Sequence, residues 1–254
     1  MGIGELAEID PGEVAVIIPA RYGSERLPGK PLADLCGKPM VIRVLQAVEA
    51  FSPQVLAVAT DDAGIEEAVE SRGFEAVMTG PASSGTERVH AAWKRLGRPG
   101  RLVINLQCDE PFVDEAWLSA LTSGFSGQDG MEVTTLGRPM LIDDSPDPHR
   151  VKVVVGRKGR ALYFSRSPVP HGATGFVEHL GLYCFTPESL EACALSDPRS
   201  GPAELEGLEQ LAWMEEEIRV TVLVDEFESW SVDTLEDLEV ARRMVRGRGG
   251  EVDG

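Results

Sequence analysis

Three basic side chains gather in a short segment that follows an apolar run near the start of the chain. The run Val14–Ile18 leads directly into residues 19–31, PARYGSERLPGKP, which carry Arg21, Arg26 and Lys30 together with two glycines. Glycine lets a ligand approach the backbone closely, and arginine and lysine bind phosphate oxygens. The segment therefore has the composition of a triphosphate cradle.

The spacing of the two glycines separates this segment from a P-loop. Five residues lie between Gly23 and Gly29 where the P-loop has four, and Pro31 takes the place of its magnesium-binding serine or threonine. The alternative interpretation is a surface turn with solvated charges. We favour the cradle because the segment directly follows a strand predicted to be buried, where parallel sheets bind ligands.

Two aspartates are candidates for a magnesium site. Asp109 follows the apolar run Leu102–Leu106, and Asp233 lies just before the helical pattern Leu235–Arg246. In nucleotide sites Mg²⁺ takes one or two protein carboxylates and completes its shell with phosphate oxygens and water. The pair therefore predicts a magnesium ion shared with a triphosphate.

Helix capping is the alternative role for both aspartates. Asp109 and Glu110 could cap the helix that follows them, and Asp233 has a threonine after it and Glu236 three residues later, which is good capping spacing. A cap and a metal site can coexist at Asp233 if the cap needs only one carboxylate oxygen. From the sequence alone both roles stay open.

A turn of small residues, SSGTER at 83–88, opens another helical pattern. Its hydroxyls and backbone amides could contact a base or a ribose. They could also form an N-cap with Glu87 in the first turn of the helix, where an acidic side chain is favourable. The spacing by itself favours the cap.

Alternating apolar runs and helical patterns must position these residues. In the first half the sequence predicts three strands and three helices: Val14–Ile18, Pro39–Ala50, Val55–Ala59, Ala63–Ser71, Leu102–Leu106 and Asp114–Thr122. Continuously apolar strands that alternate with helices predict an α/β fold with a mostly parallel sheet. Its ligands are expected beyond the carboxyl ends of the strands.

The second half of the chain has a different rhythm. Strands are predicted at Val151–Val155 and Val220–Val224, with the loop-rich stretch Ser165–Gly175 between them, and we expect these strands as antiparallel additions to the sheet. The last predicted helix is Leu235–Arg246. Residues 1–13 are expected to form an N-terminal extension and residues 247–254 a flexible tail.

Composition limits the class of protein. With 254 residues and 43% hydrophobic content the chain can bury a full core, and a formal net charge of -18 disfavours nucleic acid as a partner. No apolar stretch approaches the roughly 20 residues that span a bilayer, and no signal pattern opens the chain, so we expect a cytoplasmic protein with no membrane partner. The four cysteines lack the spacing of a zinc site or a disulfide framework.

Taken together, these segments resemble the 3-deoxy-manno-octulosonate (Kdo) cytidylyltransferases. The resemblance rests on IIPARYGSERLPGKPLADLCGKPM, VATDD, SGTER, NLQCDEP, VKVVV, ALYFSRSPVP, HLGLY, LEQL and VDTLEDL, which cover nearly the whole chain in order. It implies a Rossmann-like nucleotidyltransferase fold in one domain, residues 14–246. It also implies a dimerisation and acceptor-binding insertion at about 138–215, and hence a homodimer.

The resemblance also implies a set of site residues. Nucleotide binding, with CTP as the nucleotide, is implied for Ala20, Arg21, Gly23, Ser24, Lys30, Ser84, Gly85, Thr86, Arg88 and Gln107. Contacts with a small acidic acceptor are implied for Gln107, Arg166, His179, Tyr183, Glu209 and Gln210. Mg²⁺ is implied on Asp109 and Asp233, and catalytic roles are implied for Arg21, Lys30 and Asp109. The reaction would be an in-line attack of an acceptor oxygen on the α-phosphorus of CTP.

Two departures from the family pattern bear on the acceptor. Cys108 stands where the family motif has glycine, and Trp230 adds a large ring close to Asp233. Both are expected to narrow the acceptor pocket. The alternative to Kdo, the acceptor used for lipopolysaccharide, is therefore a smaller phosphonate such as phosphonoformate in antibiotic metabolism.

A third hypothesis is a nucleotide-binding module without turnover. The chain keeps all four of the residues that the chemistry requires: Arg21, Lys30, Asp109 and Asp233. A module that only binds a nucleotide has no need of the metal pair, so this hypothesis is disfavoured.

Overall fold

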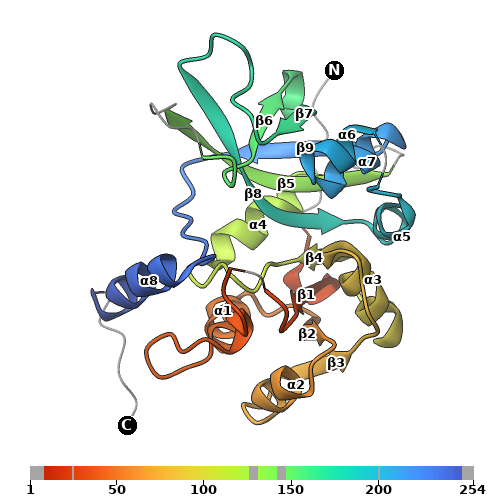
Figure 1. Cartoon of the computed structure of the whole chain (residues 1–254). Coiled ribbons are helices and arrows are strands. Elements are labelled where there is room, and N and C mark those ends of the chain that lie inside the picture. The colour runs from red at the N-terminus through yellow and green to blue at the C-terminus, as the bar shows by residue number, and fades with distance from the viewer. Residues whose placement is uncertain (1–8, 25, 126–130, 142–146, 200, 248–254) are drawn as a thin grey trace. The chain divides into compact units, whose positions relative to one another are not determined.

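The computed structural model describes residues 9–24, 26–125, 131–141, 147–199 and 201–247 (Figure 1). Two compact units divide the chain. The first, here called the parallel unit, comprises Pro11–Gly100, Asn105–Glu115 and the residues from Glu228 onward. The second, the mixed unit, comprises Arg101–Ile104, Ala116–Phe227 and the residues before Pro11.

Three parallel strands form the sheet of the parallel unit. Their order is β3-β2-β1, with Ala15 opposite Val55 and Ala57 opposite Glu75. The strands are β1 (Val14–Ala20), β2 (Val55–Thr60) and β3 (Glu75–Met78). Every residue of β1 is buried, as expected of a strand covered on both faces.

Four α-helices belong to the same unit. They are α1 (Met40–Val48), α2 (Ala63–Glu70), α3 (Gly85–Arg95) and α8 (Leu235–Gly247), accompanied by the short helices η1 (Pro11–Glu13), η2 (Lys30–Leu32) and η3 (Glu49–Phe51). Helix α8 packs through Leu238, Ala241 and Val245 against buried side chains from other segments, Leu27, Leu35, Met40 and Val232. This cluster ties the segment before α8 to the loop that carries Lys30.

The mixed unit is built around strand β5 (Glu132–Leu141). Strand β8 (Gly175–Phe185) pairs with β5 in the antiparallel sense, and β9 (Arg219–Val224) pairs with its other edge in parallel. Strand β6 (Lys152–Val155) lies antiparallel to both β7 (Ala161–Ser165) and β8. The remaining elements are β4 (Leu102–Asn105), α4 (Glu115–Ser123), η4 (Arg157–Gly159), α5 (Pro187–Leu195), α6 (Gly201–Glu206) and α7 (Glu209–Glu215).

The α/β class with a mostly parallel sheet and antiparallel additions is confirmed. Every strand and helix predicted from apolar patterns is present, with ends shifted by a few residues at most. One expectation was wrong: Val220–Val224 is part of β9, which pairs with β5 in parallel, whereas Val151–Val155 does form an antiparallel strand, β6. Each of these short runs is rich in valine and carries one polar residue, Lys152 or Thr221, and so short a pattern does not fix the direction of the strand.

Both ends of the chain lie largely outside the described residues. The predicted tail, 247–254, is described only at Gly247, and the predicted extension, 1–13, only from residue 9 on. Among the helices of the described segments, none combines the length and the apolar content that crossing a bilayer requires.

Candidate active site

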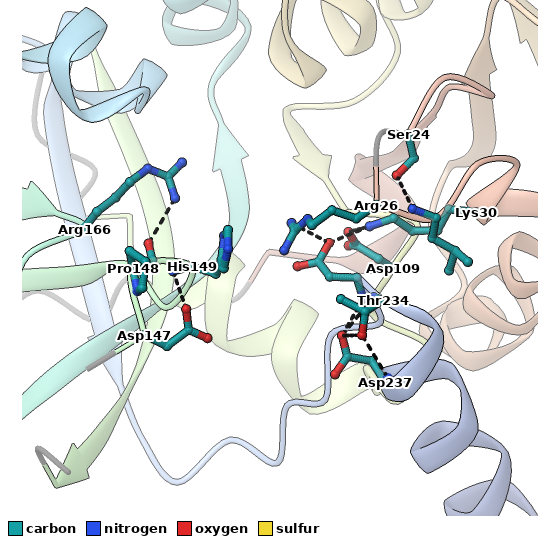
Figure 2. A network of polar contacts seen from close by, with 12 residues as sticks. Ser24, Arg26, Lys30, Asp109, Asp147, Pro148, His149, Arg166, Thr234 and Asp237 are labelled. Atoms are coloured by element: carbon teal, nitrogen blue, oxygen red, sulfur yellow. Dashed lines mark hydrogen bonds and ion pairs between the residues drawn. The ribbon is translucent and has the colours of Figure 1, made fainter. Parts of the chain in front are cut away.

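Lys30 lies between two carboxylates in the parallel unit, and Figure 2 shows it beside one of them, Asp109. Its Nζ donates hydrogen bonds to Asp109 Oδ2 at 2.8 Å and to Asp233 Oδ1 at 2.7 Å. The lysine side chain is only 11% exposed, and the carboxylate side chains are 21% and 31% exposed. Three residues far apart in the sequence thus meet at one partly buried point.

A glycine turn sets the position of Lys30. Gly29 has a φ of 69°, a left-handed conformation that favours glycine, and its N–H bonds to the carbonyl of Tyr22 at 3.0 Å. A side chain at this position would also meet the Tyr22 ring at 3.3 Å. The turn therefore closes the basic loop on itself just before Lys30 begins η2.

A backbone hydrogen bond brings the two aspartates together. The carbonyl of Asp109 accepts the N–H of Val232 at 2.9 Å, and Val232 is fully buried in the hydrophobic cluster that packs against α8. Asp233 is the next residue, so its carboxylate is delivered beside that of Asp109. Helix α4 begins only at Glu115, which excludes the predicted capping role for Asp109 and Glu110.

The cap of α8 is Thr234 and not Asp233. Thr234 Oγ1 accepts the N–H of Asp237 at 3.2 Å, and Asp237 Oδ2 accepts the N–H of Thr234 at 2.9 Å, which is a reciprocal capping box. The alternative role that the sequence left open for Asp233, a cap with Glu236, is not the one found, because the capping register lies one residue later. Its carboxylate is left free for Lys30 and for Arg26, whose Nη2 lies 3.1 Å from Asp233 Oδ1.

Removing this cap is expected to destabilise the fold moderately. Thr234→Ala should lower the free energy of unfolding by about 1 kcal/mol, because an N-cap hydroxyl is lost. Chemical denaturation measures the effect, with Thr174→Ala at an exposed position as the matched control. A free energy that is unchanged in Thr234→Ala would show that the helix does not depend on this cap.

The charged side chains of the site stabilise one another in their ionised forms. Burial works against the Lys30 ammonium, but Asp109 and Asp233 outweigh burial and raise the pKa of Lys30 well above its usual value. Burial likewise works against the Asp233 carboxylate, but Lys30 and Arg26 lower its pKa. Lys30 and Asp233 therefore remain charged throughout the physiological pH range.

The pair of aspartates fits the donor set of magnesium. Both carboxylates lie within 3 Å of the same cationic nitrogen, so both already face one positive charge. In the described part of the chain no group of three or more His, Cys, Asp or Glu side chains could enclose a metal ion. Two carboxylates with room for phosphate and water are what Mg²⁺ uses in nucleotide sites.

The SSGTER turn is an N-cap, as its spacing favoured. Ser84 Oγ accepts the N–H of Glu87 at 3.2 Å, and Glu87 Oε2 accepts the N–H and the hydroxyl of Ser83, both at 2.6 Å. The bonds from Ser83 lower the pKa of Glu87. These hydrogen bonds hold the first turn of α3.

Amide side chains connect this turn to the end of β4. Gln107 Nε2 donates to Asn105 Oδ1 at 3.0 Å, and Asn105 Nδ2 donates to Thr86 Oγ1 at 3.3 Å. A side chain at Gly85 would come within 3.5 Å of Gln107 Nε2. The structure thus brings together Gly85, Thr86 and Gln107, three of the predicted nucleotide contacts.

Arg88 has a structural role that sequence reasoning missed. It is buried, and its guanidinium donates to Thr79 Oγ1 at 2.8 Å and to Asp61 Oδ2 at 2.7 Å. These contacts fix α3 against the ends of β2 and β3. Of the other predicted nucleotide contacts, Ala20 ends β1 and Arg21 is exposed just after it.

Five of the six predicted acceptor contacts lie in the mixed unit, and Gln107 lies in the parallel unit. His179 and Tyr183 on β8 stand with their ring centroids 5.4 Å apart, and Tyr183 packs edge-on against Trp213 at 4.9 Å. Gln210 is buried at the start of α7, next to the half-buried Glu209. Arg166 follows the end of β7.

His179 is neutral, and its proton can be assigned. Thr135 Oγ1 donates to the carbonyl of Leu182 at 2.6 Å, so its contact of 2.9 Å with His179 Nε2 must be donated by the histidine. Nδ1 is then the acceptor. Burial lowers the pKa of His179 to about 3.

The His179 ring is therefore expected not to titrate in the physiological range. Its NMR signals should stay constant between pH 5 and pH 8, whereas an unperturbed histidine titrates near 6.5. As pH falls through that value the unfolded chain gains a proton that folded His179 refuses, so stability falls. A midpoint near 6.5 for His179 itself would contradict the assignment.

Glu178 and Trp230 both have partners in the structure. Glu178 accepts hydrogen bonds from Arg138 Nε at 2.9 Å and Arg150 Nη2 at 3.0 Å, so its negative charge is more than balanced. Trp230 packs against the cluster around α8, and its Nε1 donates to the carbonyl of Asp237 at 3.3 Å. Burial raises the pKa of Cys108 to about 12, which keeps the thiol protonated.

Comparison with known proteins places these features in context. A cytidylyltransferase family model matches residues 15–223. A 3-deoxy-manno-octulosonate cytidylyltransferase of Anaeromyxobacter sp. is 43% identical over 238 residues, which are 91% of this chain and 96% of the relative. The enzyme of the same name from Porphyromonas gingivalis is 40% identical over 254 residues, 94% of this chain and 99% of the relative.

Solved structures agree. A structure of CMP:2-keto-3-deoxy-manno-octonic acid synthetase complexed with CTP superposes with a TM-score of 0.84 at 34% identity, covering 93% of this chain and 99% of that one. A cytidylyltransferase from Leptospira borgpetersenii has a TM-score of 0.60 at 20% identity, covering 92% and 87%, and shares the fold alone. The Rossmann-like nucleotidyltransferase fold expected from the sequence is thereby confirmed.

Proposed function

Because the chain belongs to the 3-deoxy-manno-octulosonate cytidylyltransferase family, we propose that it transfers CMP from CTP to 3-deoxy-manno-octulosonate and releases pyrophosphate. The names of the relatives support this acceptor, and the CTP complex of the structural neighbour supports this nucleotide. The relatives named above do not support the smaller phosphonate. Membership of a family of enzymes also disfavours a binding module without turnover.

The convergence of Lys30, Asp109 and Asp233 carries the proposal. The two carboxylates would hold Mg²⁺, which when bound neutralises phosphate charge and orients the triphosphate. Lys30 is held charged and pre-positioned, so it can exchange its carboxylate partners for phosphate oxygens. Positioning and electrostatics then supply most of the rate, as is general for phosphoryl and nucleotidyl transfer.

Arg21 supplies a second phosphate contact in this proposal. It is exposed directly after β1, and it forms no ion pair with any residue of the described segments. Arg26, which shares Asp233 with Lys30, is a third cation at the same place. Gly23 and Ser24 complete the loop, and Ser24 Oγ accepts the N–H of Leu27 at 3.4 Å. The basic loop of an acidic protein would thus face the triphosphate.

Acceptor binding is assigned to the predicted residues of β8, α7 and the end of β7 in the mixed unit. The unprotonated Nδ1 of His179 can accept a hydroxyl hydrogen bond, and Arg166 can bind a carboxylate.

We place the enzyme in the cytoplasm as a homodimer. An apolar groove of about 530 Å³ on β5, β6 and β8 supports the homodimer, because it lies mostly within the insertion that the resemblance predicts to form the dimer.

Pyrophosphate release from CTP and Mg²⁺ with a panel of acids tests the acceptor. Turnover is expected with 3-deoxy-manno-octulosonate and absent with phosphonoformate. UTP in place of CTP should react slowly. Turnover with phosphonoformate and none with the sugar acid would reverse the proposal and favour the narrowed pocket expected beside Cys108 and Trp230.

A further inference from the structure

Lys152 is a fully buried lysine that the proposed chemistry does not use. It lies on β6, where its backbone is paired on one side with Ser165 of β7 and on the other with Glu178 of β8. Its Nζ donates to the carbonyl of Asp147 at 2.8 Å and to the carbonyl of Arg166 at 2.9 Å. No ion pair joins it to a carboxylate of the described residues; burial lowers its pKa, and the charges of Asp147 and Glu178 oppose that shift only in part.

A buried ammonium without a carboxylate partner is an expensive way to stabilise a fold. Replacing buried charges by apolar side chains of similar volume often leaves stability unchanged or improves it. The ammonium has another use, because it can donate to two backbone carbonyls from different loops at once. Lys152 thus joins Asp147, in the segment before β6, to the point where the chain leaves β7.

Several hydrogen bonds hold Arg166 at that point, and Figure 2 shows the one to the carbonyl of Pro148. Its guanidinium donates to three backbone carbonyls: Nε to Glu206 at 2.7 Å, Nη1 to Pro148 at 3.1 Å and Nη2 to Gly207 at 3.3 Å. Its backbone N–H donates to Glu206 Oε2 at 2.8 Å, and Ser165 Oγ donates to Glu206 Oε1 at 2.7 Å. A guanidinium has five N–H groups, so two remain for a ligand.

We propose that Lys152 is a positioning residue for acceptor binding: its ammonium fixes the Asp147 and Arg166 carbonyls so that Arg166 presents its two remaining N–H groups to the carboxylate of the acceptor. This inference rests on the proposed acceptor role of Arg166. The strand that carries Lys152 is paired on both edges, and rigid elements hold binding groups more accurately than loops do. Asp147 Oδ1 also accepts the N–H of His149 at 2.7 Å. This bond holds the turn that contains Pro148, whose carbonyl is a partner of Arg166.

The test measures the KM of each substrate in Lys152→Met, Arg166→Ala and the double variant. Lys152→Met should raise the KM of the acceptor roughly tenfold or more and change the KM of CTP less than about twofold. In the Arg166→Ala background the same substitution should add less than about a further twofold, because the group that Lys152 positions is already gone. Lys158→Met, at an exposed lysine of the same unit, serves as the control.

A purely structural role gives a different result. If Lys152→Met raises both KM values equally, or raises the acceptor KM by the same factor in both backgrounds, Lys152 does not act through Arg166. If Arg166→Ala raises the acceptor KM and Lys152→Met does not, the positioning role alone is wrong. If Arg166→Ala has no effect, the acceptor role of Arg166 is wrong, and the inference falls with it.

A second variant covers the case in which Lys152→Met does not fold. Glu206 is half-buried and holds the same turn from α6, so Glu206→Ala should raise the acceptor KM by a smaller factor, roughly threefold to fivefold, and spare CTP. The control is Glu204→Ala, an exposed residue of the same helix. An unchanged acceptor KM in Glu206→Ala would count against an anchored Arg166.

Discussion

Asp109→Ala is expected to lower kcat for CMP transfer about 1,000-fold or more, because charge stabilisation at the triphosphate depends on both carboxylates. The fold should persist, since Lys30 keeps Asp233 as a partner at 2.7 Å. Circular dichroism and thermal unfolding check the fold, and pyrophosphate release with saturating CTP measures kcat. Raising the Mg²⁺ concentration should restore part of the rate.

Asp197→Ala provides the matched control for this variant. Its side chain is 56% exposed and, among the described residues, pairs with Arg199 at the surface of the mixed unit, so its loss should leave kcat unchanged. If Asp109→Ala turned over within about threefold of the unmodified chain, Asp109 would not be a metal ligand in the reaction.

Lys30→Met is the second variant with a large expected effect. It should lower kcat about 100-fold to 1,000-fold and raise the KM of CTP, because a charged donor held at the triphosphate is lost. In the absence of nucleotide, the same substitution should strengthen the binding of Mg²⁺. In the unmodified chain Asp109 and Asp233 share the Lys30 ammonium as their counter-ion, and in the variant they would lose it.

Titration calorimetry with Mg²⁺ alone separates these effects. Tighter metal binding together with slower turnover identifies Lys30 as the group that occupies the metal carboxylates before the substrate arrives. Lys94→Met, at an exposed lysine near the carboxyl end of α3, should change neither quantity. Weaker Mg²⁺ binding in Lys30→Met would contradict the proposed competition between the ammonium and the metal.

The pattern of apolar runs predicted β1 and β2 of the parallel unit because these strands are mostly buried, whereas β3, whose residues are exposed or half-buried, was not predicted. Val14–Ile18 and Val55–Ala59 read as continuous apolar runs, and both are strands. The long strands β5 and β8 were not predicted. Gly137 and Gly181 interrupt them, and β5 shifts register near Gly137, so neither sequence shows a regular alternation.

The candidate site was predictable where it depends on strand ends. Lys30 and Asp109 both follow buried strands, and the edge of the sheet brings such residues together. The cap of α8 was misplaced because the segment from Asp233 to Asp237 contains two overlapping capping registers one residue apart. Tertiary contacts decide between them, since Lys30 and Arg26 take the Asp233 carboxylate and leave Thr234 to cap.

Partners that lie far apart in the sequence were not predictable. Arg88 matches a family motif for nucleotide binding, yet Asp61 and Thr79 hold its guanidinium. Glu206 carries no motif, yet it anchors the turn at Arg166. Such ion pairs and side-chain bonds depend on loop conformations that periodicity and spacing do not specify.

A crystal structure with CTP and Mn²⁺ in place of Mg²⁺ tests the central claim most directly, because anomalous scattering locates the manganese ion. The account predicts one ion bound by oxygens of both Asp109 and Asp233 and by the triphosphate, with Lys30 Nζ turned from the carboxylates to a phosphate oxygen. An ion bound away from either aspartate, or Lys30 still paired with both of them beside the bound nucleotide, would contradict it.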